Sequence, residues 1–107
     1  MKTLKFEDKL AKLILKGEKT TTWRLFDDKD LIEGDELILI NSDTKEEFAK
    51  ARIIELKEKK LKDLDDEDWQ GHEEFVSDKE MYKVYSEYYN KEVIGDDLVK
   101  IIKFELI

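Results

Sequence analysis

The sequence of 107 residues has no cysteine, no proline and a single histidine, His72. Without cysteine there is no disulfide framework, thiolate nucleophile or cysteine-ligated zinc, and one histidine argues against a histidine-rich metal site. No apolar run approaches the roughly 20 residues that a membrane span needs, and the start, MKTLKFEDKL, carries acids where a signal peptide is apolar. We therefore expect a soluble, unprocessed, cytoplasmic protein that has no membrane partner, metal or other cofactor.

Charge is abundant but unevenly distributed. Charged residues make up 45% of the chain, a composition typical of thermophilic proteins, and the net charge is -8. An acidic protein is poorly suited to gripping long duplexes, so no duplex DNA partner is expected. Residues 1–26, however, hold seven lysines and arginines against three acids and so carry +4, which leaves -12 for the other 81 residues. The basic first quarter is therefore the place to look for a ligand site.

A helix followed by a strand is predicted within this basic region. An apolar stripe with helical spacing runs along residues 6–16, and Gly17 marks the end of the helix. The threonine run that follows favours a strand over Lys19–Leu25, because β-branched side chains fit a pleated surface better than a helix. On that strand Thr20, Thr22 and Arg24 share one face, and Trp23 lies on the opposite, apolar face, where we expect it to belong to the core.

The rest of the chain alternates between strand and helix patterns. Further elements are predicted as strands over Glu36–Ile40, Phe48–Leu56 and Leu98–Ile107, a short helix containing Trp69, and a longer helix after the capping sequence at Ser77. The first two of these strands form a hairpin, and the charged segment Lys57–Lys62 is interpreted as a strand end and a solvated connector. The sequence therefore predicts a single α+β domain over 1–107, with about five mostly antiparallel strands and two to three flanking helices.

These residues resemble the ASCH domain family of the PUA-like superfamily over nearly the whole chain. The segment GEKTTTWR at 17–24 matches the family signature G-x-K-T-x-T-x-R, and further matches are Gly34-Asp35-Glu36-Leu37, an LDDED segment and a closing FEL. The resemblance implies a small β-barrel with flanking helices. It also implies a cleft to which the K-T-x-T-x-R segment contributes.

The resemblance implies two kinds of activity as well. ASCH domains have been proposed to bind RNA, and one bacterial branch resembles an amidohydrolase that removes the acetyl group from N4-acetylcytidine. In that branch a lysine and the second threonine of the motif act with a later glutamate. The first two correspond to Lys19 and Thr22. The ungapped third position holds His72, and Glu73 and Glu74 follow it, so which of the three takes this position stays open.

The chemistry of the motif is consistent with either activity. A threonine needs a base to become a nucleophile, and a lysine partly removed from water can serve as that base. Lys19 meets Thr22 only if it lies in the turn after Gly17, where strand alternation does not hold. Arg24 suits a phosphate or a polarised carbonyl oxygen. The candidate ligand-binding residues are Lys19, Thr20, Thr22 and Arg24, and the candidate catalytic residues are Lys19, Thr22, His72 and Glu73.

Three hypotheses remain, in this order. The first is a module that binds RNA or a nucleotide, the second an amidohydrolase of N4-acylated cytidine-type nucleosides, and the third an acidic domain that docks a basic protein. The tyrosines at 82, 85, 88 and 89 are interpreted as helix packing, and the acids at 63–68 as a helix N-terminus and solubilising surface. The sequence decides neither whether the protein is an enzyme nor its oligomeric state.

Overall fold

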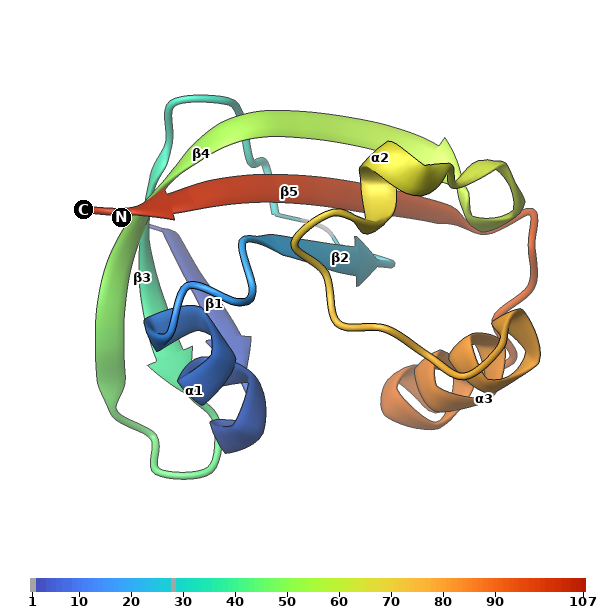
Figure 1. The fold of residues 1–107 in the computed structure, drawn as a ribbon, viewed down its shortest axis with the longest axis horizontal. Coiled ribbons are helices and arrows are strands. Elements are labelled where there is room, and N and C mark those ends of the chain that lie inside the picture. The colour runs from blue at the N-terminus through green and yellow to red at the C-terminus, as the bar shows by residue number, and fades with distance from the viewer. Residues whose placement is uncertain (1, 28) are drawn as a thin grey trace.

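A computed structural model describes residues 2–27 and 29–107 and contains one curled five-stranded sheet. In chain order the strands are β1 (Lys2–Phe6), β2 (Thr21–Leu25), β3 (Glu36–Asn41), β4 (Glu47–Lys60) and β5 (Leu98–Leu106). Their order in the sheet is β1-β3-β4-β5-β2, and only the β1–β3 pair is parallel within the described chain. The sheet bends into an open half-barrel (Figure 1). The predicted α+β, PUA-like barrel fold with mostly antiparallel strands is confirmed.

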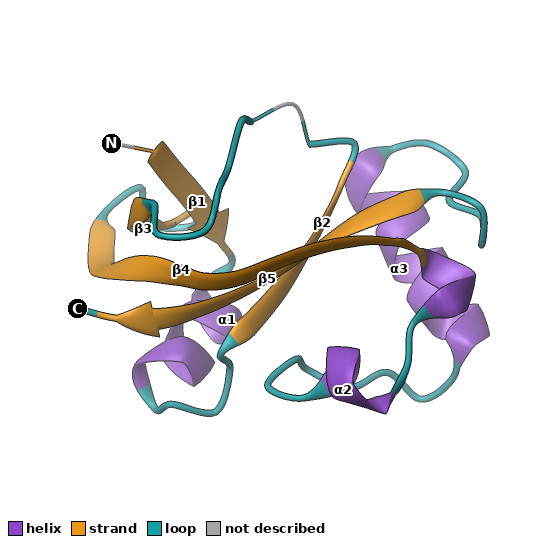
Figure 2. Cartoon of the chain, turned by 90° about the horizontal axis from the view of Figure 1, so that it is seen from above, coloured by secondary structure: helices purple, strands orange, loops and turns teal. Residues whose placement is uncertain are grey.

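Three α-helices flank this sheet: α1 (Asp8–Leu15), α2 (Asp66–Trp69) and α3 (Asp78–Tyr89). The two longer helices, α1 and α3, both lie below β2 in Figure 1, and the view from above in Figure 2 shows α1 to the left of β2 and α3 to its right. As predicted, α3 begins at Ser77, whose hydroxyl accepts a hydrogen bond from the Glu80 backbone N–H at 3.2 Å. No helix among the described residues is both long and apolar enough to cross a membrane.

The sequence-based prediction was wrong about two strands, β1 and the end of β4. The first strand, β1, was missed, although Leu4 and Phe6 are buried and Lys5 is exposed, which is the alternation of a strand. The segment expected to be a solvated connector, Lys57–Lys62, instead continues β4 as far as Lys60 and pairs with β5. Charged residues remain in this strand because the ladder to β5 satisfies their backbone groups and nearby acids pair with their ammonium groups.

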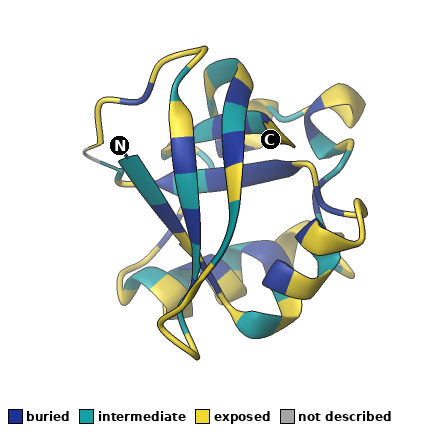
Figure 3. Ribbon diagram, turned by 90° about the vertical axis from the view of Figure 1, so that its left-hand side faces the viewer, coloured by how far each residue is buried: buried dark blue, intermediate teal, exposed yellow. Residues whose placement is uncertain are grey.

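The buried apolar residues form two core clusters. One lies between β1, β3, β4 and the end of β5, and includes Phe6, Leu37 and Phe104. The other is covered by α3 and includes Trp23, as predicted, together with Met81. Buried and more exposed residues alternate along β3, whereas four of the five residues of β2 are buried (Figure 3). Neighbouring residues Ile101 and Ile102 of β5 belong to different clusters, so this strand is covered on both faces.

The two edge strands of the half-barrel, β1 and β2, are bridged by one side chain. Arg24 on β2 donates a hydrogen bond from Nη2 to the Lys5 carbonyl of β1 at 2.8 Å. Its guanidinium carbon also lies 4.7 Å from the centre of the Phe6 ring, a cation–π contact. Arg24 thus contributes to closing the sheet as well as presenting a charge at its edge.

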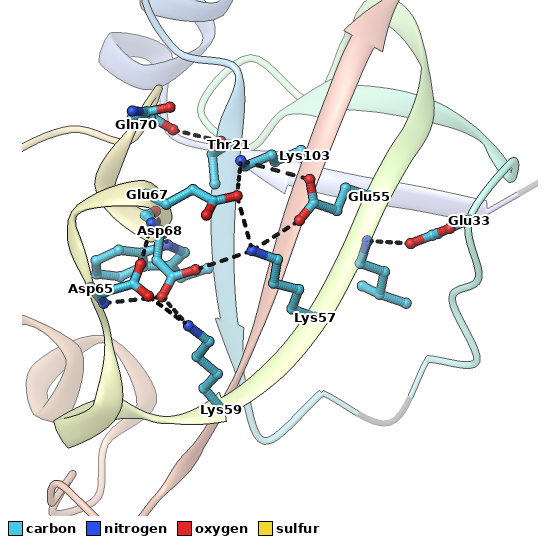
Figure 4. A network of polar contacts seen from close by, with 12 residues as sticks. Thr21, Glu33, Glu55, Lys57, Lys59, Asp65, Glu67, Asp68, Gln70 and Lys103 are labelled. Carbon is cyan, nitrogen blue, oxygen red and sulfur yellow. Dashed lines mark hydrogen bonds and ion pairs between the residues drawn. The ribbon is translucent and has the colours of Figure 1, made fainter.

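Helix α2 is fastened to β4 by a buried carboxylate (Figure 4). Asp68 is 0% exposed and pairs through Oδ2 with Lys59 Nζ at 2.7 Å, while Asp65 caps the helix. The expected helix N-terminus at 63–68 is confirmed, but Asp68 belongs to the interior rather than to a solubilising surface. Within residues 2–27 and 29–107, no cluster of three or more His, Cys, Asp or Glu residues is arranged to hold a metal ion. The expected thermophilic source and cytoplasmic location stay predictions.

Candidate functional site

The turn that ends α1 places the Lys19 side chain in the interior. Gly17 has φ 80°, and its N–H bonds the Ile14 carbonyl at 3.0 Å, while the Glu18 N–H bonds the Leu13 carbonyl at 2.9 Å. This pair of bonds is a Schellman motif, which needs the left-handed conformation that glycine adopts without strain. The chain then reverses, so that Lys19 lies before the first residue of β2, as the hypothesis of a Lys19–Thr22 site requires.

The ammonium of Lys19 is buried and paired. Lys19 is 2% exposed, donates from Nζ to the Thr21 carbonyl at 2.8 Å, and forms an ion pair with the Glu73 carboxylate. Burial lowers the pKa of Lys19 below its ordinary value, although the charge of Glu73 opposes this. Burial alone would raise the pKa of Glu73, but the Lys19 ammonium and the nearby His72 bring it below its ordinary value. Glu73, rather than His72, therefore takes the position against Lys19.

The loop that carries Glu73 is docked onto the start of β2. The Gly71 carbonyl accepts hydrogen bonds from the N–H groups of Thr20 and Thr21 at 2.8 and 3.0 Å, and the Thr21 hydroxyl donates to the Gln70 carbonyl at 2.9 Å. Gly71 has φ 77°, and a Cβ added there would overlap the Thr20 hydroxyl. Only glycine permits this close approach, which fixes the register of the loop against β2.

A cavity of about 150 Å³ lies between α1, β2, the Glu73 loop and α3. Thr22, Arg24 and Glu73 are among its polar lining residues. Its aromatic lining residues are Phe6, Trp23, Phe75, Tyr85, Tyr88 and Tyr89. Thr22 is 4% exposed. The wall thus combines a hydroxyl, a carboxylate and a guanidinium with aromatic faces.

Thr20 and His72 differ in their relation to this cavity, because His72 lines it and Thr20 does not. Thr20 is exposed, packs against Gly71 and does not line the cavity. His72 is buried and stacked on Trp23, with ring centroids 3.8 Å apart, and burial lowers its pKa to about 4. His72 is therefore neutral at pH 7 and has no proton to give as an imidazolium.

Sequence reasoning missed the aromatic side of the site. Tyr82, Tyr85 and Tyr89 pack against the second core cluster, as the helix interpretation predicted. Tyr88, in contrast, is 58% exposed and lines the cavity, with its ring edge-on to Tyr89 at 4.9 Å between centroids. Phe75 also lines it, from a loop of unpatterned sequence. The helical spacing of Tyr88 predicted packing, so the sequence carried no signal for its place at the cavity.

Comparison with known proteins found one family model and several similar structures. The model described as ASCH domain matches residues 1–107. The chain is similar to the Enterococcus faecalis V583 protein EF3133 (17% identity, TM-score 0.83, covering 100% of this chain and 76% of that one). It is also similar to an ASCH domain from Lactobacillus crispatus JV V101 (15% identity, TM-score 0.74, covering 98% of this chain and 79% of that one). A third similar structure is the hypothetical protein PH0355 (25% identity, TM-score 0.73, covering 100% of both chains). No curated protein matched.

The close approach at Gly71 generates a stability prediction with an internal control. Gly71→Ala is expected to destabilise the fold by about 2 kcal/mol or more, because the new methyl group meets the Thr20 hydroxyl in addition to the strain of a positive φ. Gly34 has φ 90° but open space around it, so Gly34→Ala isolates the conformational strain alone. Urea unfolding of both variants measures the difference, and equal losses would contradict the steric role of Gly71.

His72 is the one histidine of the chain, so its NMR titration needs no assignment. Its pKa in the folded protein is expected near 4 rather than the ordinary 6.5. Between these values the unfolded chain binds a proton that the folded chain does not, so stability falls by about 3 kcal/mol as the pH drops from 6.5 to 4. Ring-proton shifts that titrate near pH 6.5 in the folded state would show that the ring is not buried as described.

Proposed function

Because this chain belongs to the ASCH domain family, we propose that it is a small amidohydrolase of N4-acylated cytidine-type nucleosides. The observation that carries the proposal is the buried Lys19–Glu73 pair beside a cavity whose wall includes Thr22. A buried ion pair is costly to desolvate and adds little to stability compared with apolar packing. Ionisable groups whose pKa values are shifted by burial and by a charged partner at a cavity are more typical of a reactive site than of a scaffold.

The chemistry assigned to these groups is acyl transfer through threonine. Thr22 Oγ attacks the acyl carbonyl carbon, and its proton passes to the Lys19 amine, whose lowered pKa increases the fraction in the neutral, basic form. The bond between the carbonyl carbon and the exocyclic nitrogen breaks, and that nitrogen takes a proton from the Lys19–Glu73 pair. A water molecule then hydrolyses the Thr22 ester, which releases the carboxylic acid and restores the hydroxyl.

The size and lining of the cavity support a single base-sized ligand. Its volume of about 150 Å³ is similar to that of an engineered apolar cavity that admits benzene. Aromatic walls suit a planar nucleobase, because every base presents a face that stacks on such rings. A duplex, whose bases are already stacked and paired, presents no such face.

The test is whether the protein hydrolyses N4-acetylcytidine, with the reaction measured as loss of substrate over time. Thr22→Val and Glu73→Gln keep the side-chain shapes but remove the reacting groups, so each is expected to reduce kcat/KM by about 100-fold or more. Thr3→Val is the matched control, because Thr3 is a threonine on β1 that does not line the cavity. Activity that survives Thr22→Val would exclude the threonine as nucleophile. Absence of turnover by the wild type with any N4-acylated nucleoside would overturn the proposal.

A second candidate function, binding of short single-stranded RNA or a nucleotide, is favoured by the rim of the cavity. Lys5, Lys9 and Arg24 line it together with the exposed ring of Tyr88. On its other side Arg24 borders a second cavity of about 350 Å³, whose acids are Asp27, Glu58, Asp96 and Asp97. Those carboxylates repel phosphate, so the positive footprint is short. The third hypothesis, docking of a basic protein, gains no such support, since several acids are already paired with lysines of this chain.

RNA binding is expected to be weak, salt-sensitive and dependent on Arg24. Arg24→Ala should weaken binding of a short single-stranded oligonucleotide about fivefold, because it removes a planar, charged donor. Arg52→Ala is the control, since Arg52 pairs with Glu36 on the sheet and lines neither cavity. Arg24 also bridges β1 and β2, so unfolding midpoints are measured in parallel. Unchanged affinity in Arg24→Ala, or tight duplex binding with a steep salt dependence, would exclude this footprint.

A further inference from the structure

The imidazole of His72 joins three elements of the fold. Its ring stacks on Trp23 of β2, with the ring planes 19° apart, and its side chain is 1% exposed. Nδ1 lies 2.7 Å from the Glu73 carbonyl oxygen in the loop, and Nε2 lies 3.4 Å from the Tyr85 hydroxyl on α3. The ring is thus a fixed contact between a strand, a helix and the loop that carries Glu73.

The partners of the ring assign its tautomer. A carbonyl oxygen can only accept, so Nδ1 carries the hydrogen and donates to Glu73. Nε2 is then an acceptor, and the Tyr85 O–H donates to it. Burial raises the pKa of Tyr85, so its hydroxyl keeps this proton. Both ring nitrogens of a neutral His72 are therefore satisfied, whereas an imidazolium would lose the bond from Tyr85.

Nδ1 of His72 also lies near the side-chain carboxylate of Glu73. Nδ1 is 3.6 Å from Glu73 Oε2, the oxygen that pairs with Lys19. Glu73 lies in a loop without regular secondary structure, so no helix or strand ladder fixes its backbone. The bond from His72 to the Glu73 main-chain carbonyl supplies such a constraint at the residue that carries the carboxylate.

We propose that His72, itself held by Tyr85, is a positioning residue that sets the Glu73 carboxylate against Lys19. Its kinetic consequence rests on the proposed amidohydrolase function, but its structural consequence does not. The charged and titratable groups that face the ring are Lys19, Glu73 and Tyr85. His72 acts through Glu73 and does not touch the reacting atoms.

The test compares variants that remove one contact at a time. Tyr85→Phe removes only the hydroxyl bonded to Nε2, and Tyr82→Phe is the matched control on the same helix, because Tyr82 does not contact His72. His72→Ala removes both contacts of the ring, whereas His72→Asn retains an amide donor for the Glu73 carbonyl. Each variant is examined by NMR with 15N-labelled histidine and 13C-labelled glutamate, and by kinetics with N4-acetylcytidine.

The wild type is expected to show the Nδ1–H tautomer, and Tyr85→Phe a mixture of tautomers. His72→Ala should move the Glu73 titration towards its ordinary value and lower kcat about tenfold, with KM within about twofold, because a displaced carboxylate affects the reaction step. His72→Asn should retain more activity than His72→Ala. Tyr82→Phe should change neither the tautomer of His72 nor the titration of Glu73.

An Nε2–H tautomer in the wild type would overturn the inference. So would a Glu73 titration that is unaltered in a folded His72→Ala variant, or a single unchanged tautomer in Tyr85→Phe. If the wild type hydrolyses no N4-acylated nucleoside, the proposed function fails, while the NMR measurements still decide whether His72 positions Glu73.

Discussion

The ion pair between Lys19 and Glu73 is the interaction around which this small fold is arranged. An ammonium that is 2% exposed loses most of its hydration, so its partners must compensate within the protein. One partner, the Thr21 carbonyl, is two residues away, whereas Glu73 is 54 residues away in the chain. The pair forms only when the end of α1 and the loop after α2 are both docked on β2. Folding and assembly of the site are therefore the same event.

The open edge of the half-barrel imposes a second constraint. A sheet that does not close leaves unpaired backbone groups on its edge strands, β1 and β2. Arg24 satisfies one of them by bonding the Lys5 carbonyl and packing over Phe6, at the place where the cavity begins. The residue that we propose to meet a ligand phosphate thus also holds the scaffold. A substitution at Arg24 is therefore expected to change stability as well as ligand affinity.

Local patterns predicted most elements but misjudged two strands, for physical reasons. A five-residue strand such as β1 is too short to outweigh the helical stripe that overlaps it at Phe6, and its parallel pairing with β3 is non-local. The charged end of β4 looks solvated in sequence, since its lysines find their acids only after α2 packs on the sheet. Both errors concern contacts made in the folded chain: the pairing of β1 with β3, and the pairing of the end of β4 with β5 and with acids six and nine residues away.

The sequence by itself determined the helix end at Gly17, the threonine strand, the burial of Trp23 and the family resemblance. Each depends on local conformational preference or on a contiguous motif. The tertiary structure alone decided that Glu73, and not His72, faces Lys19, and that Thr20 lies outside the cavity. It also placed Tyr88 at the rim. These outcomes depend on how closely Gly71 approaches β2, a distance that no pattern along one chain encodes.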